Sequence, residues 1–209
     1  SDVYKRQAVV TILFKIIPLP KQEELRNLGL IGTMREVLGT VWKSIVLIWV
    51  IMVLHAFVTQ SFSTFIPVLY AKEGYSLVAI GSMISILTLA GAFSGLLAGY
   101  LSDKIGYKLI LYVTHSLATP SLFLFLYLPG DWVFLAAFLV GFFSMAVLPL
   151  GLAMALELAP KGKSMIASLV MGLAFGMGGM MTPLAGKFAD MFSIRSVLFF
   201  LAIIPLLTI

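Results

Sequence analysis

The sequence predicts an all-α integral membrane protein, and three observations lead to that prediction. Of the 209 residues, 61% are hydrophobic and only 11% are charged, and the mean hydropathy is +1.09. A water-soluble domain of this length cannot bury so much apolar surface. The charges fall between long apolar stretches, so the formal net charge of +5 indicates a membrane, and not a nucleic acid, as the partner.

Charge-free stretches mark the expected helices in chain order. Five of them reach the roughly 20 residues that a helix needs to cross about 30 Å of hydrocarbon. They are residues 44–71, 74–102, 109–130, 132–156 and 164–186. Two shorter stretches, 8–17 and 196–209, are interpreted as the end of a preceding helix and the start of a following one. The sequence thus predicts five complete membrane helices and two partial ones, in a chain truncated at both ends.

The residues before the first complete helix are expected to form three parts. Residues 1–7 match neither a signal peptide nor the apolar sequence after them, and are interpreted as a foreign leader. Residues 8–18 are expected to end a membrane helix. Residues 19–43 interleave charged and apolar residues at helical spacing, which predicts a surface loop with an interfacial helix. A plain linker is the alternative.

Basic residues between the helices predict the orientation. When alternate loops are assigned to alternate sides, one side holds eight Lys and Arg residues and the other holds three. An excess of positive charge marks the cytoplasmic side. The turns near Glu73, Asp131 and Asp190 are therefore expected outside, and the other loops inside.

The most informative loop covers residues 99–108, with the sequence GYLSDKIGYK. Gly99 allows two helices to approach closely, Gly106 allows a turn with positive φ, and Asp103 is a fixed anion. The pattern resembles the signature loop of the major facilitator superfamily, and departs from it only at Tyr107, where the family has a basic residue. A solvated Asp103 is the alternative to a functional one. The candidate gating residues are Gly99, Asp103, Lys104, Gly106, Lys108 and, from the next cytoplasmic loop, Glu157.

This resemblance implies a place in a known architecture. A signature loop with one departure is typical of the second copy, between helices eight and nine of the family. The chain would then hold the end of helix six in 8–18, the central cytoplasmic loop in 19–43, and helices seven to eleven with the start of helix twelve in 44–209. The implied fold is the C-terminal six-helix bundle, whose partner is a missing N-terminal six-helix half of the same polypeptide. Asp103 is expected to hold the start of the helix near Ser164, where free amides favour an anion.

The sequence of 155–190 resembles one branch of that superfamily. The segment ALELAP at 155–160 is followed by SMIASLVMGLAFGMGG at 164–179 and by GKFAD at 186–190. A turn and a glycine-rich helix of this kind are similar to the fosmidomycin-resistance branch of drug efflux proteins. Most of these residues concern helix packing, so they support the branch more than a substrate.

Glycines at helical spacing predict close contacts between helices. Gly91 and Gly95 lie four residues apart in one stretch, as do Gly172 and Gly176 in another. Small residues at this spacing let helix backbones touch. Static packing and a surface that slides or bends during transport are both compatible with the pattern.

Polar side chains within the apolar stretches are few, and the first complete helix holds most of them. His55, Thr59 and Ser63 stand four residues apart and share one face, with Gln60 beside them. The resemblance implies that this helix lines the central cavity, which makes these four residues candidates for the substrate cavity. Hydrogen bonding between helices is the alternative. His115 lies in a helix that the resemblance makes peripheral, and is assigned to packing.

The acidic residues after residue 43 lie at helix ends and none is in mid-membrane. If protons drive transport, the coupling acid is expected in the missing first half, with His55 as the titratable alternative here. The absence of cysteine excludes thiolate metal sites and cysteine nucleophiles. No catalytic residues, metal or cofactor are predicted.

The expected function is secondary active transport, with proton-coupled efflux of small drug-like or metabolite compounds by alternating access. An uptake transporter of the same superfamily is the alternative. A membrane-embedded enzyme or a structural helical bundle is less well supported, because an enzyme needs clustered Asp, His or Glu. The expected partners are the lipid bilayer, a small molecule and protons, and the expected location is the bacterial or archaeal cytoplasmic (inner) membrane.

Overall fold

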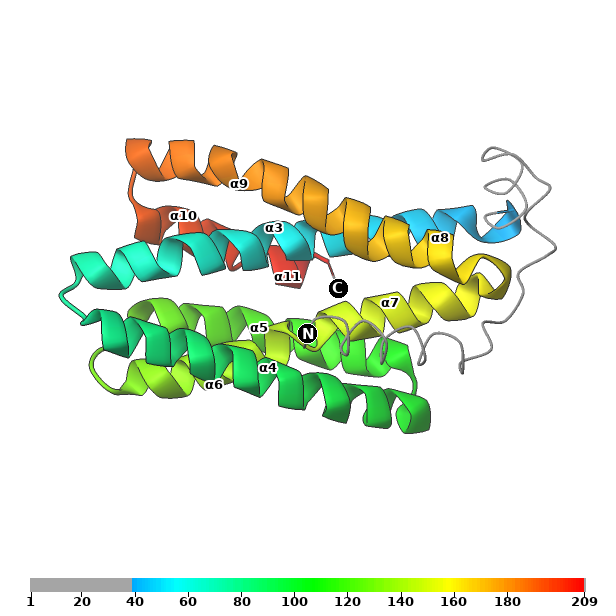
Figure 1. The fold of residues 1–209 in the computed structure, drawn as a ribbon, viewed down its shortest axis with the longest axis horizontal. Coiled ribbons are helices and arrows are strands. Elements are labelled where there is room, and N and C mark those ends of the chain that lie inside the picture. The colour runs from blue at the N-terminus through cyan, green and yellow to red at the C-terminus, as the bar shows by residue number, and fades with distance from the viewer. Residues whose placement is uncertain (1–38, 209) are drawn as a thin grey trace, which may run out of the picture. The chain divides into compact units, whose positions relative to one another are not determined.

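The computed structural model describes residues 39–208, which form helices and the turns between them (Figure 1). A short turn of 3-10 helix, η1 (Gly39–Val41), leads into α3 (Trp42–Lys72), α4 (Leu77–Ile105) and α5 (Tyr107–Tyr127). The predicted leader at 1–7, the helix end at 8–18 and residues 19–38 of the predicted central loop lie outside the described residues. The last five residues of that loop form η1 and the start of α3.

The rest of the described chain forms interrupted helices. They are α6 (Trp132–Ser144) and α7 (Val147–Leu158), then η2 (Pro160–Gly162), α8 (Lys163–Ala167), η3 (Ser168–Leu173) and α9 (Ala174–Met191), and finally α10 (Ile194–Leu201) and α11 (Ile204–Leu207). Here η3 is a turn of π-helix that links α8 to α9.

The break between α6 and α7 has an identifiable cause. Pro149 in the first turn of α7 has no N–H, and its ring clashes with the carbonyl four residues earlier, at Met145. Residues 145–146 accordingly leave the helical pattern. In a continuous helix the Phe142 carbonyl would accept the N–H of Ala146; here it accepts the hydroxyl of Ser94 from α4.

Within the described part of the chain, five segments are long and apolar enough to cross a membrane. They are Trp42–Lys72, Leu77–Ile105, Tyr107–Tyr127, Trp132–Leu158 and Lys163–Met191. The five predicted stretches are confirmed, with ends that differ by a few residues. The last helix continues past Lys187, because a long charged side chain near a helix end can reach water while its backbone stays helical.

Three turns meet at one end of the bundle. The Tyr75 hydroxyl donates to the Gly130 carbonyl at 3.2 Å, which ties the α3–α4 turn to the α5–α6 loop. Arg195, at the start of α10, forms an ion pair with Glu73 in the same turn. The expectation that these turns share one side is therefore confirmed.

Close backbone contacts hold α4 against α6 and α3 against α9. A side chain at Gly141 would overlap the Leu87 backbone of α4, and a Cβ at Gly91 would lie 2.6 Å from that of Met145. Gly178 faces Ala56 of α3 at the same distance. Gly95 has room for an ordinary contact, 3.7 Å from Pro149.

Three of the predicted contacts are not formed among the described residues. A Cβ at Gly99, Gly172 or Gly176 would meet nothing within 4 Å. The close approach expected at Gly99 and the packing expected at Gly172 and Gly176 are thus absent from this bundle. The reason is that helical spacing identifies a small-residue face, whereas tertiary packing decides which face is covered; in α9 the covered glycine is Gly178.

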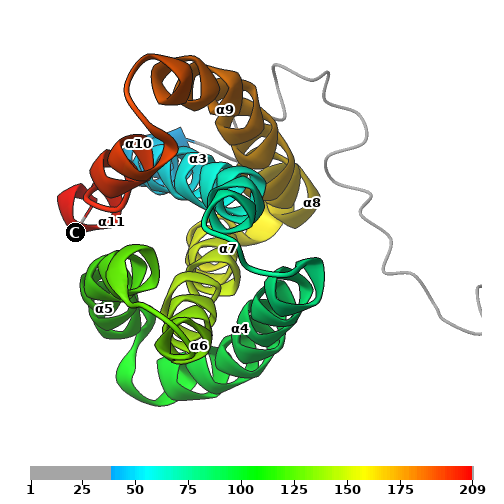
Figure 2. The ribbon, with the colours of Figure 1, turned by 90° about the vertical axis from the view of Figure 1, so that its left-hand side faces the viewer.

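Exposure divides the helices into two groups. Only 28% of the most apolar part of Leu77–Ile105 and of Lys163–Met191 is buried, against 50% to 56% in the other three. In Figure 2, α3 and α7 lie between α4 on one side and α8 and α9 on the other. The two least buried helices, Leu77–Ile105 and Lys163–Met191, therefore lie on either side of α3 and α7 (Figure 2).

Candidate functional site

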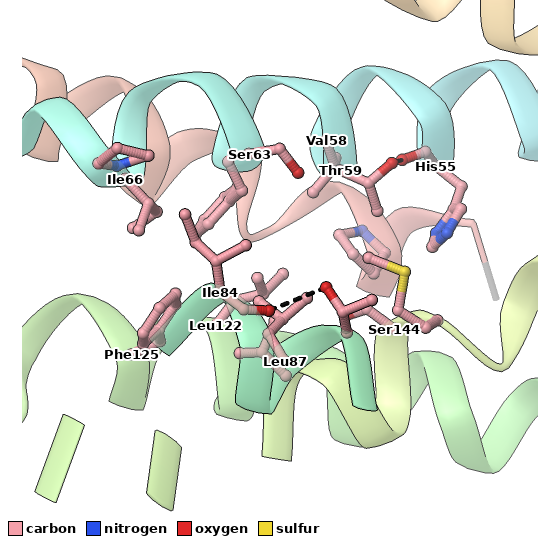
Figure 3. Close-up of a pocket in the computed structure, with 16 residues that line it drawn as sticks. His55, Val58, Thr59, Ser63, Ile66, Ile84, Leu87, Leu122, Phe125 and Ser144 are labelled. Atoms are coloured by element: carbon pink, nitrogen blue, oxygen red, sulfur yellow. Dashed lines mark hydrogen bonds between the residues drawn. The ribbon is translucent and has the colours of Figure 1, made fainter. Parts of the chain in front are cut away.

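A cavity of about 120 Å³ lies inside the bundle beside α3 (Figure 3). Helix α3 supplies most of one wall, and α4, α5 and α6 supply the opposite side. The apolar lining is Val58, Phe62, Ile66, Pro67, Ile84, Leu87, Leu122, Phe125, Val140, Met145 and Pro205. Ile84 and Ser63 are exposed, so the cavity reaches the surface between α3 and α4.

Five other lining side chains carry hydrogen-bonding groups: His55, Thr59, Ser63, Thr88 and Ser144. The Thr59 hydroxyl donates to the His55 carbonyl at 3.0 Å, and the Thr88 hydroxyl donates to the Ile84 carbonyl at 2.8 Å. Each hydroxyl keeps lone pairs that can accept a hydrogen bond from a ligand. The cavity thus offers acceptors in a largely apolar lining.

Ser144 differs from Thr59 and Thr88 in its hydrogen bonding. It is 4% exposed, and its oxygen has no hydrogen-bond partner among residues 39–208. A buried hydroxyl without a partner is destabilising by about 1–3 kcal/mol. A water molecule or a bound ligand would satisfy it. Sequence reasoning missed Ser144, and its position near the end of α6 gave no signal that it faces α3.

The structure separates the four predicted cavity residues. His55, Thr59 and Ser63 line the cavity together. Gln60 instead lines a shallow groove between α3 and α9, together with Thr64, Phe65, Gly179, Thr182 and Pro183. One helical residue is a rotation of about 100°, so Gln60 faces a different neighbour from Thr59.

His115 lies beside the same cavity residues. Its ring centroid is 6.1 Å from that of His55, with the two rings inclined by 58°. Both residues are buried: His55 is 6% exposed and His115 is 2% exposed. The sequence did hold one signal for this pair, because the chain has only these two histidines and both lie in apolar stretches.

In the signature loop, Asp103 forms its hydrogen bond with a residue at the start of the next helix, Tyr107. Gly106 has a φ of 91° between α4 and α5, as its predicted role requires. Asp103 is exposed and accepts a hydrogen bond from the Tyr107 hydroxyl at 3.3 Å. The ammonium of Lys104 lies 4.4 Å from the centre of the Tyr100 ring. Lys108 and Glu157 are both exposed.

The expected contact between Asp103 and the helix start near Ser164 is not formed. Helix α8 begins at Lys163 and has no capping side chain. In this structure Tyr107 begins α5 directly after the Gly106 turn, and its hydroxyl donates to Asp103. Tyr107, the residue that departs from the signature pattern, is therefore the hydrogen-bond partner of Asp103 in this structure.

Comparison with known proteins identifies the architecture. A family model described as Major Facilitator Superfamily matches residues 8–183. The chain belongs to the major facilitator superfamily. Over 118 residues it is 31% identical to the fosmidomycin resistance protein of Escherichia coli (strain K12). That stretch covers 56% of this chain and 29% of the relative, so the match spans less than a third of the relative's length.

Family membership and the five apolar helices together describe an all-α, multi-pass integral membrane protein. The predicted resemblance to the fosmidomycin-resistance branch is confirmed. The major facilitator superfamily is a family of transporters. For this chain, the five apolar helices indicate the lipid bilayer as a partner.

Proposed function

We propose that the chain forms the second half of a secondary active transporter that exports small drug-like or metabolite compounds in exchange for protons. The observation that carries this proposal is the cavity beside α3, where His55, Thr59 and Ser63 meet an apolar wall. The lining that the described residues provide contains no Asp, Glu, Lys or Arg. Such a wall suits compounds that are mainly apolar and carry a few hydrogen-bonding groups.

The size of the cavity supports a site shared with another bundle. Pockets that enclose a drug-sized molecule usually measure about 300–1,000 Å³, and this cavity measures about 120 Å³. A single bundle would therefore supply one part of the site, and a first half of the transporter would supply the opposite wall. Alternating access then follows from rocking of the two halves around a site near the midplane.

The poorly buried helices are the proposed contact surface for that first half. Gly172 and Gly176 are exposed and have open space beside them, so another helix could approach closely there. The π-helical turn η3 lies in the same helix and is a type of irregularity often found at functional sites. We assign the gating role to the loop around Asp103, with Lys104, Lys108 and Glu157 as its neighbouring charges.

The name of the relative supports the direction of transport. A protein that confers resistance to fosmidomycin is consistent with removal of that compound from the cell. Fosmidomycin is therefore the first probe compound for this chain. We place the transporter in the cytoplasmic membrane of a bacterium or archaeon.

Everted membrane vesicles carrying the complete transporter test the proposal. An acidic lumen should drive accumulation of radiolabelled fosmidomycin, and collapse of the pH gradient should abolish it. The 209-residue chain alone serves as a control and should give no net transport, because it supplies one bundle. Accumulation in right-side-out vesicles alone would favour an uptake transporter, and accumulation that ignores the gradient would contradict proton exchange.

A further inference from the structure

We infer that His55 and His115 together form a proton-binding site between the cavity and α5, which takes up one proton in each transport cycle. The inference rests on the proposed exchange for protons and names the groups that carry the proton in this half. The two ring centroids lie 6.1 Å apart. The two rings come from α3 and α5, so the site joins two membrane helices.

Hydrogen bonding fixes which nitrogen of His115 is free. Its Nδ1 lies 3.1 Å from the Leu111 carbonyl of its own helix. A carbonyl can only accept, so Nδ1 carries the hydrogen and Nε2 of the neutral ring keeps its lone pair. Within the described part of the chain, no hydrogen bond engages the His55 ring. Each neutral ring therefore keeps one basic nitrogen available for a proton.

No fixed charge faces the pair from the surrounding helices. The nearby polar groups are hydroxyls: Thr59 and Ser63 of α3, Thr88 of α4, Thr114 of α5 and Ser144 of α6. The charged or titratable residues of the packed elements lie towards helix ends: Lys43, Tyr70 and Lys72 of α3, Tyr100, Asp103 and Lys104 of α4, Tyr107, Lys108, Tyr112 and Tyr127 of α5, Glu157 of α7, and Lys187 and Asp190 of α9. Helices α6, α10 and α11 contribute only Arg195, which pairs with Glu73.

The separation of the rings sets the number of protons. Two positive charges at this distance repel strongly in an apolar environment. Coupled groups of this kind titrate as a pair, and the first proton disfavours the second. The pair is therefore a site for one proton, shared between two rings.

The pair lies between two cavities. His55 lines the cavity described above. Leu111, whose carbonyl binds His115, lines a second cavity of about 230 Å³ with Lys108, Tyr112 and Met52. Lys108 is in the first turn of α5, so this second cavity approaches the predicted cytoplasmic end. His55 is thus the member of the pair that a proton would reach from a cavity.

Two transport readouts in vesicles with the complete transporter separate coupling from binding. One is accumulation of the same probe compound driven by a pH gradient, and the other is exchange of labelled for unlabelled probe without a gradient. His115→Gln should lose accumulation and keep exchange. His55→Gln should lose accumulation as well, but its exchange is not a control, because His55 also lines the proposed substrate cavity. Ser121→Ala is the matched control, because this buried hydroxyl of α5 bonds the Leu117 carbonyl of its own helix at 2.7 Å and lines neither cavity; it should keep both activities.

A second measurement counts the proton directly. Addition of the probe to the detergent-purified transporter in weak buffer should release a proton from the wild type and none from either histidine variant. Accumulation that survives in both variants would overturn the inference and leave the proposed function intact. Loss of exchange together with accumulation in both variants would assign the histidines to structure or substrate binding, and would also overturn it. A wild type that exchanges the probe without any response to the gradient would overturn the proposed proton exchange itself.

Discussion

At Gly141 and Gly176, the effect of adding a side chain depends on which atoms lie next to the glycine. Gly141 of α6 lies directly against the Leu87 backbone of α4, whereas Gly176 of α9 faces open space. A backbone neighbour cannot rotate away from an added methyl group, unlike the end of a flexible side chain. The two positions therefore differ in their tolerance of alanine.

Gly141→Ala should destabilise the transporter by about 1–3 kcal/mol, because it overpacks the contact between α4 and α6. Gly176→Ala should leave stability unchanged or raise it slightly, since alanine favours a helix over glycine. Thermal unfolding of the detergent-purified 209-residue chain measures the difference, because Gly176 is assigned to the contact with the first half in the full-length transporter. Equal unfolding temperatures for the two variants would contradict the packing described here.

The end of α5 is an element held by a side chain from another helix. The last carbonyls of a helix have no partner within it, and the Phe125 carbonyl near that end accepts the hydroxyl of Tyr70 from α3. Tyr70 is 2% exposed. Tyr75 makes a similar bond to Gly130, but at an exposed site.

Tyr70→Phe should destabilise the bundle by about 1–3 kcal/mol, because it leaves a buried carbonyl unpaired. Tyr75→Phe is the matched control and should have a smaller effect, since water can replace its hydroxyl. Both values come from thermal unfolding of the full-length protein. A larger effect at Tyr75 would show that the Tyr70 bond does not anchor α5.

The α4–α5 loop is expected to switch partners during transport. In this structure Tyr107 occupies Asp103, and the proposed gating role requires the aspartate to hold a cytoplasmic helix start in the outward-open state. A charge-assisted contact of about 1–3 kcal/mol shifts a balanced equilibrium by roughly fivefold to more than a hundredfold.

Asp103→Asn should therefore shift the full-length transporter towards the inward-open state and lower transport. Tyr107→Phe should shift it the other way, because it frees the carboxylate. Spin-label distances across the cytoplasmic mouth measure both shifts. Unchanged distances and normal transport in the two variants would leave Asp103 a solvated loop residue.

At the scale of helices, the sequence was sufficient to predict where the membrane helices lie in the chain. It was not sufficient to predict how those helices pack against one another. Charges are excluded from the membrane interior, so the spacing of Lys, Arg, Asp and Glu located five helices to within a few residues. Periodicity within α3 grouped His55, Thr59 and Ser63. It could not show that Gln60 faces α9 or that His115 reaches His55, because those facts depend on how helices from distant parts of the chain pack.

At the scale of the whole bundle, the two least buried helices, α4 and the Lys163–Met191 helix, lie on either side of α3 (Figure 2). The proposed transport pathway runs along this side, with the exposed Ser63 at the mouth of the cavity. Helix α5 lies away from α8 and α9 in the same view and is expected to face lipid. The central claim is therefore that water reaches the polar face of α3 in mid-membrane and does not reach the outer face of α5.

Single cysteines at Ser63 and Leu117 test this claim most directly, because the chain has none of its own. Ser63 lies nine residues before the end of α3, and the exposed Leu117 lies ten before the end of α5, so their depths match. A thiol reacts with a maleimide as the thiolate, which forms in water and not in lipid. A membrane-impermeant maleimide should label Ser63→Cys in the full-length transporter and leave Leu117→Cys unlabelled. Labelling of Leu117→Cys without Ser63→Cys would contradict the account.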